Sequence, residues 1–94
     1  MSDKHAYEKK LQARLDEWSA EIDRLKAKSD AMKADAQLEY HRRIDDLAAM
    51  REAAGERLEE LRNASDDAWE DLKGGAEEAW TRLEKALLSA KSRF

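Results

Sequence analysis

The chain has 94 residues, of which 43% are charged, a net charge of −4 at pH 7, and neither proline nor cysteine. The lack of cysteine excludes disulfides, zinc–thiolate sites and cysteine nucleophiles, and the negative charge argues against a nucleic-acid partner, which would need a basic surface. Because little interrupts a helix and large apolar residues are few, the composition predicts an all-α protein of long helices rather than a globular enzyme.

The first two-thirds of the chain carry apolar residues at the spacing of a coiled coil. Their steps alternate between three and four residues along Leu11, Leu15, Trp18, Ile22 and Leu25. This spacing predicts one long coiled-coil helix over residues 1–62. From Met32 to Ile44 the steps lengthen to four, which would locally unwind such a coil. A break near Ser29 would give a three-helix bundle instead, and this is the alternative architecture; Gly55 is a further weak break signal.

A turn is predicted over residues 63–67, which read Asn-Ala-Ser-Asp-Asp. Asparagine and serine suit a chain break and a helix N-cap. Residues 66–80 hold six acids and one base, whereas residues 81–94 hold four bases and one acid. This order suits the dipole of one separate helix. The favoured architecture is therefore a helical hairpin, with a long helix over 1–62, a turn at 63–67 and an amphipathic helix over 68–94.

An eleven-residue repeat marks the last segment, where DAWEDL at 67–72 returns as EAWTRL at 78–83. At about 100° per residue, seven apolar side chains of this segment share one helix face. They are Trp69, Leu72, Ala76, Trp80, Leu83, Leu87 and Phe94. Such a face suits packing against another helix, and contact with lipid is the alternative. The acidic first half of the segment argues against lipid, because helices that lie on membranes usually carry lysine and arginine.

No constellation in the sequence predicts catalysis or metal binding. His41 and Asp45 have the i, i+4 spacing of two helical metal ligands, but two ligands do not make a site. The serines lack a neighbouring histidine in the sequence, and Gly74-Gly75 lacks the other elements of a phosphate-binding loop. We therefore expect no enzyme activity, no cofactor and no metal.

Two longer stretches carry a family resemblance. YEKKLQARLDEWSAEIDRLKAKSDAMKADAQLEYHRRIDDL, followed by NASDDAWEDLKGGAEEAWTRLEKAL, resembles short bacterial coiled-coil proteins that are usually labelled stress-response or hypothetical proteins. The resemblance implies a cytosolic, non-enzymatic and stress-associated role, with no catalytic residues to carry over. The eleven-residue repeat is also similar in pattern to exchangeable apolipoproteins, synucleins and dehydration-protective proteins, many of which contact lipid.

These features predict a cytoplasmic scaffold that self-associates through its apolar stripes. No apolar run approaches the roughly 20 residues that span a bilayer, and the N-terminus lacks the apolar core of a secretory signal. The alternative function is a peripheral membrane or lipid-surface binder acting through the helix at 66–94. Another protein is a further candidate partner. The predicted interaction residues are Trp18, Ile22, Leu25, Leu58, Leu61, Trp69, Leu72, Trp80, Leu83 and Leu87.

Overall fold

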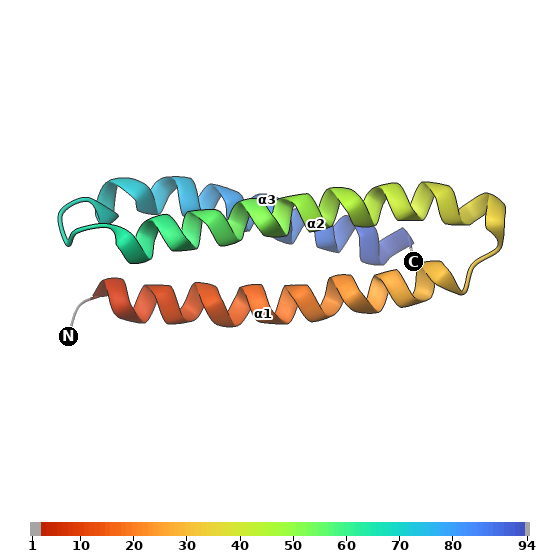
Figure 1. The fold of residues 1–94 in the computed structure, drawn as a ribbon, viewed down its shortest axis with the longest axis horizontal. Helices are drawn as coiled ribbons and strands as arrows, with labels where there is room; N and C mark the ends of the chain where they lie inside the picture. The colour runs from red at the N-terminus through yellow and green to blue at the C-terminus, as the bar shows by residue number, and fades with distance from the viewer. Residues whose placement is uncertain (1–2, 94) are drawn as a thin grey trace.

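Three α-helices form an elongated bundle in the computed structural model, which describes residues 3–93. The helices are α1 (Asp3–Asp30), α2 (Ala34–Asn63) and α3 (Trp69–Arg93). They run up, down and up again along a rod that measures 51 × 19 × 18 Å (Figure 1). The all-α fold class is thereby confirmed. Phe94, which the sequence assigned to the apolar stripe, lies outside the described residues.

The prediction of one long helix over residues 1–62 is wrong. The chain leaves the helix after Asp30, reverses its direction and enters α2 at Ala34 (Figure 1). This is the break near Ser29 that the alternative architecture requires, whereas Gly55 lies within α2. The reversal falls at the start of the stretch in which the apolar steps lengthen to four residues.

Short-range hydrogen bonds close the end of α1 at this reversal. The backbone N–H groups of Ala31 and Met32 donate to carbonyl oxygens three residues earlier, at 3.2 and 3.1 Å. From α2, Gln37 Nε2 donates to the Asp30 carbonyl at 2.9 Å, and His41 Nε2 lies 3.1 Å from Asp30 Oδ1. The backbone bonds and the Gln37 bond satisfy carbonyl groups that a helix end leaves unpaired, and the His41 contact adds a second link between α1 and α2 at the turn.

One hydrophobic core runs the length of the rod and explains why the chain folds back. All three helices contribute buried side chains to it, and α2 packs closely on both of its neighbours, whereas α1 and α3 contact each other less. The buried apolar residues are Leu11, Ile22, Leu25, Ile44, Leu47, Ala54, Leu58, Leu61, Trp69, Ala76, Trp80, Leu83, Leu87 and Ala90. In one extended helix the stripes of α1 and α2 would both face water, and burying them drives the reversal.

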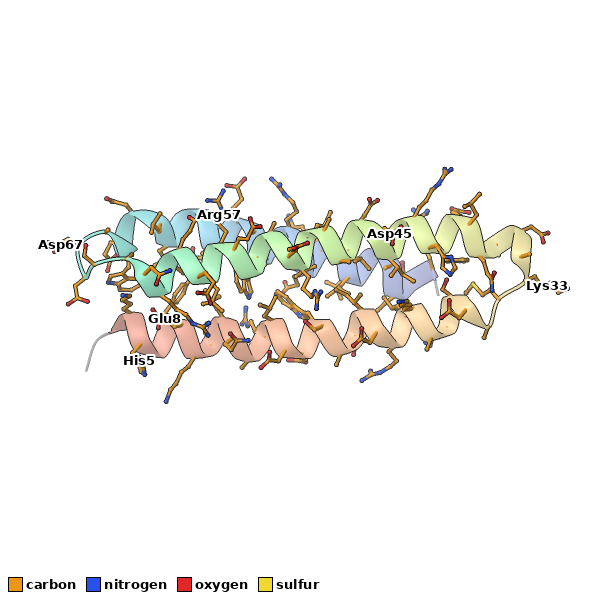
Figure 2. The ribbon with its side chains drawn as sticks, viewed as in Figure 1. His5, Glu8, Lys33, Asp45, Arg57 and Asp67 are labelled. Carbon is orange, nitrogen blue, oxygen red and sulfur yellow. The ribbon has the colours of Figure 1, made fainter. Side chains whose placement is uncertain are left out.

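The second turn, over residues 64–68, overlaps the stretch 63–67 in which the sequence predicted a turn. α2 ends at Asn63 and α3 begins at Trp69. Between them, Ser65 Oγ accepts the backbone N–H of Ala68 at 3.2 Å, as an N-cap serine does. The two turns lie at opposite ends of the rod, with Lys33 at one end and Asp67 at the other (Figure 2). The His5 and Glu8 side chains of α1 lie toward the Asp67 end (Figure 2).

Candidate functional site: the groove between α1 and α3

The residues predicted for helix–helix contact gather inside the single chain. Eight of the ten are buried in the core, namely Ile22, Leu25, Leu58, Leu61, Trp69, Trp80, Leu83 and Leu87. The other two, Trp18 and Leu72, are half-buried and pack against that core. The tryptophan face of α3 therefore finds its partner helices within the chain, and any association between copies must use a surface that the bundle leaves open.

Such a surface is a groove of about 230 Å³ between α1 and α3. It forms where these two helices are held apart, since each packs mainly on α2. Buried Leu11 and Trp80 contribute apolar atoms to its lining, and half-buried Tyr7 and Trp18 add aromatic surface. Tyrosine and tryptophan supply large contact areas with a polar edge, as is common at protein interfaces. The groove thus presents a surface of the kind that suits recognition by another protein.

Charged side chains line the groove with a different sign on each helix. Lys10 and Arg14, termed the basic rim, come from α1. Glu77 and Glu84, termed the acidic rim, come from α3. All four side chains are exposed. They border the same cavity, so the positive and negative side chains lie at the same height along the rod.

An aromatic cluster lies at the Asp67 end of the groove. The rings of Tyr7 and Trp69 have centroids 6.0 Å apart at an interplanar angle of 45°. Lys73 Nζ lies 5.0 Å from the Tyr7 ring centroid and 5.6 Å from that of Trp69. These distances are within the range of cation–π attraction, so the cluster stabilises the pairing of α1 with the first turns of α3.

The Tyr7 hydroxyl has a perturbed acidity. Burial raises the pKa of Tyr7 to about 12, and the neighbouring Glu77 carboxylate acts in the same direction. The Arg14 guanidinium opposes this rise. The hydroxyl therefore stays protonated well into the alkaline range, where it continues to donate its hydrogen bond to the Glu77 carboxylate.

Polar contacts tie the helices together at the opposite end of the rod. Lys91 Nζ of α3 lies 3.4 Å from Glu21 Oε2 of α1. The Tyr40 hydroxyl of α2 donates to the carbonyl oxygen of Arg93 at 2.9 Å. α1 and α3 thus contact each other on both sides of the groove, through the aromatic cluster at one side and the Glu21–Lys91 pair at the other.

One donor that belongs to the groove lining is left without a protein partner. Trp80 is 3% exposed, and its Nε1 has no hydrogen-bond partner among residues 3–93. A buried indole N–H ordinarily finds an acceptor, and leaving it unpaired costs about 1–3 kcal/mol. Ser29 Oγ and Arg43 Nε are likewise buried without a partner in the described chain, but neither residue lines this groove.

The histidines do not assemble a metal site in the described part of the chain. His41, which has the i, i+4 spacing to Asp45 in the sequence, contacts Asp30 across the first turn. His5 Nδ1 lies 4.0 Å from Glu8 Oε2. Within residues 3–93, no group of three or more histidine, cysteine, aspartate or glutamate side chains is placed to hold a metal ion.

Sequence reasoning found the two tryptophans of the lining but missed the groove. It placed Trp18 and Trp80 in the contact stripes and treated the charged residues around them as a solvated face. The missed members are Tyr7, Lys10, Arg14, Glu77 and Glu84. A signal existed, because Lys10 and Arg14 are one helical turn apart on one segment, and Glu77 and Glu84 are two turns apart on the other. The two pairs could not be combined without knowing that α1 and α3 are neighbours that run in the same direction.

No protein-family model, curated protein or solved structure matches this chain. The resemblance to short bacterial coiled-coil proteins therefore stays a prediction from the residues alone. Among the described residues, no helix has an apolar stretch long enough to cross a bilayer. The groove geometry is accordingly the basis on which a function is proposed.

Proposed function

We propose that the protein is a non-enzymatic interaction module that associates through helical surfaces, with the α1–α3 groove as its contact site. In this proposal it acts as a cytoplasmic, stress-associated scaffold whose copies self-associate. The observation that carries the proposal is the groove itself, where half-buried Tyr7 and Trp18 border an open cavity beside buried Trp80. Aromatic side chains that are partly exposed at a fixed groove gain stability when a partner covers them.

Self-association can be measured by sedimentation equilibrium over a wide range of protein concentration. We expect association that strengthens with concentration and that the variant Trp18→Glu weakens, because a carboxylate in the groove would be desolvated by a partner. A single monomeric species at the highest concentration would contradict the proposal.

The matched control uses two large apolar side chains that are exposed elsewhere on the described part of the bundle. Leu38 is 63% exposed on α2 and Leu88 is 61% exposed on α3, and neither lines the groove. We expect Leu38→Glu and Leu88→Glu to leave association unchanged. If either of these variants abolishes association while Trp18→Glu does not, the contact site lies outside the groove.

The lipid-surface alternative through residues 66–94 requires α3 to leave the bundle. Its apolar face is turned inward, where Trp69, Trp80, Leu83 and Leu87 are buried. Detachment would expose these side chains before lipid could cover them, at a cost of about 1.5–3 kcal/mol for each large side chain. Co-sedimentation with anionic phospholipid vesicles at low salt separates the two functions. Binding that Trp80→Ala abolishes would favour the lipid surface, whereas no sedimentation with vesicles would favour the scaffold.

A further inference from the structure

We propose that the groove between α1 and α3 is occupied by the same groove of a second copy, with the two rods parallel and α1 of each copy lying against α3 of the other. This inference rests on the proposed function and adds the identity of the occupant, the orientation of the copies and the residues that specify it.

The direction of the two helices restricts how two such faces can meet. α1 and α3 run the same way along the rod (Figure 1). A face-to-face dimer with closed symmetry has its two-fold axis either along the rod or across it. An axis along the rod keeps every residue at its own height and sets α1 of one copy against α3 of the other. An axis across the rod sets α1 against α1 and α3 against α3, with the copies antiparallel.

The rim charges distinguish these two arrangements. With the axis along the rod, Lys10 and Arg14 of one copy meet Glu77 and Glu84 of the other copy. They meet at matching heights because both rims border one cavity. With the axis across the rod, the basic rim would face a second basic rim and the acidic rim a second acidic rim. Opposed like charges disfavour an interface, whereas complementary charges set its register, so the parallel arrangement is selected.

The same arrangement accounts for the aromatic side chains of the groove. Tyr7 and Trp18, which are half-buried in one copy, would lie between the basic and acidic rims at the centre of the interface. An apolar and aromatic centre with a charged rim is the usual anatomy of protein interfaces. A second copy fits better than an unrelated helix, because the groove supplies both charge signs at one height and is therefore complementary to itself.

Charge reversal tests the arrangement. We expect the acidic variant Lys10→Glu/Arg14→Glu and the basic variant Glu77→Lys/Glu84→Lys each to self-associate at least roughly tenfold more weakly than the wild type in sedimentation equilibrium. A one-to-one mixture of the two variants should recover association, because each acidic α1 then meets a basic α3 and each acidic α3 a basic α1. The variant with all four reversals should also recover it as a homodimer.

The matched control reverses charges away from the α1–α3 groove. Arg51 and Glu56 are exposed on α2 and border the groove between α1 and α2. Arg51→Glu/Glu56→Lys should associate as the wild type does. Helicity by circular dichroism should be the same for every variant, since all of the substituted side chains are exposed.

Cysteine cross-linking tests the orientation without reversing any charge. Since the native chain has no cysteine, Arg14→Cys and Thr81→Cys each introduce a unique thiol at the groove. Oxidation of a mixture should give mainly the 14-to-81 dimer when the rods are parallel. Mainly 14-to-14 and 81-to-81 dimers would show the antiparallel arrangement and overturn the inference.

The outcomes separate this inference from the proposed function. A wild type that stays monomeric at every concentration contradicts both. A wild type that associates, together with rim variants that associate equally well, leaves self-association standing and contradicts the parallel pairing of the rims. Weaker self-association of the two rim variants, together with recovered association in their mixture and in the fourfold variant, supports the inference.

Discussion

The rings of Tyr7 and Trp69 pack with their centroids 6.0 Å apart and join the first turns of α1 to the start of α3. Lys73 covers both rings from α3. This contact closes the bundle at the end where the chain passes from α2 to α3, and it places the Tyr7 hydroxyl beside Glu77. The burial of Tyr7 in this contact and its proximity to Glu77 therefore affect the response of the protein to alkaline pH.

The first prediction concerns the ionisation of Tyr7. Its pKa rises from 10 to about 12 in the folded chain. A raised folded-state pKa contributes stability that is fully present below pH 10 and is lost as the pH rises through 12. Absorbance titration of Tyr40→Phe, in which Tyr7 is the remaining tyrosine, should give a midpoint near 12. A midpoint near 10 would show that burial and Glu77 do not act on the hydroxyl.

The variant Tyr7→Phe isolates the contribution of the Tyr7 hydroxyl to the free energy of unfolding. Urea unfolding at about pH 9 and at about pH 11 should show a larger loss of unfolding free energy for the wild type than for this variant. Deprotonation of lysines lowers the stability of both proteins alike, so the difference between them reports the hydroxyl. Equal losses would contradict the prediction.

The second prediction contrasts two tryptophans of the groove. Trp80 is 3% exposed in the core, whereas Trp18 is half-buried at its edge. Trp80→Ala should lower the free energy of unfolding by about 3–5 kcal/mol, a large part of the stability of a small domain. Trp18→Ala should cost less than half as much, because water already reaches part of its ring. Urea unfolding followed by circular dichroism measures both, and equal losses would mean that the two rings are buried alike.

The third prediction concerns the adjacent glycines within α3. A methyl group built at Gly74 or at Gly75 meets no atom within 4 Å, and neither residue has a positive φ. Alanine is the better helix former, so Gly74→Ala and Gly75→Ala should each raise the free energy of unfolding by up to about 1 kcal/mol. Thermal unfolding followed by circular dichroism is the measurement. A lower melting temperature would show that the glycines serve a contact outside this chain.

The fourth prediction tests the turn between α1 and α2. Lys33 caps α2 with φ −66° and ψ 151°, a conformation that proline adopts readily. Proline there would reduce the conformational entropy of the unfolded chain. It would also prevent α1 and α2 from joining into one helix. Lys33→Pro should therefore stabilise the bundle by about 0.4–1 kcal/mol in urea unfolding.

The control places proline at another exposed lysine nearby. Lys28 lies in the last turn of α1, where proline removes a helical hydrogen bond and clashes with the preceding turn. Lys28→Pro should destabilise by about 3 kcal/mol. If Lys33→Pro is as damaging as Lys28→Pro, the chain passes through residue 33 as a helix and does not reverse there.

The sequence alone determined the helical character of the chain and most of the core. The heptad spacing of Leu11, Ile22 and Leu25 and the eleven-residue repeat of Trp69 and Trp80 mark helix faces, and these faces are buried. Ser65 marked the second turn because a side-chain cap is a local interaction that leaves a local signature.

Only the tertiary structure decided that the chain reverses after Asp30 and that α1 and α3 border a groove. Residues 31–33 contain neither glycine nor proline, so no local preference forbids a continuous helix there. The reversal is stabilised by burial of the α1 stripe on α2 and by contacts of Gln37 and His41 with Asp30, which exist only after the chain has folded back. The groove has the same origin, because its charges come from helices that tertiary packing brings together.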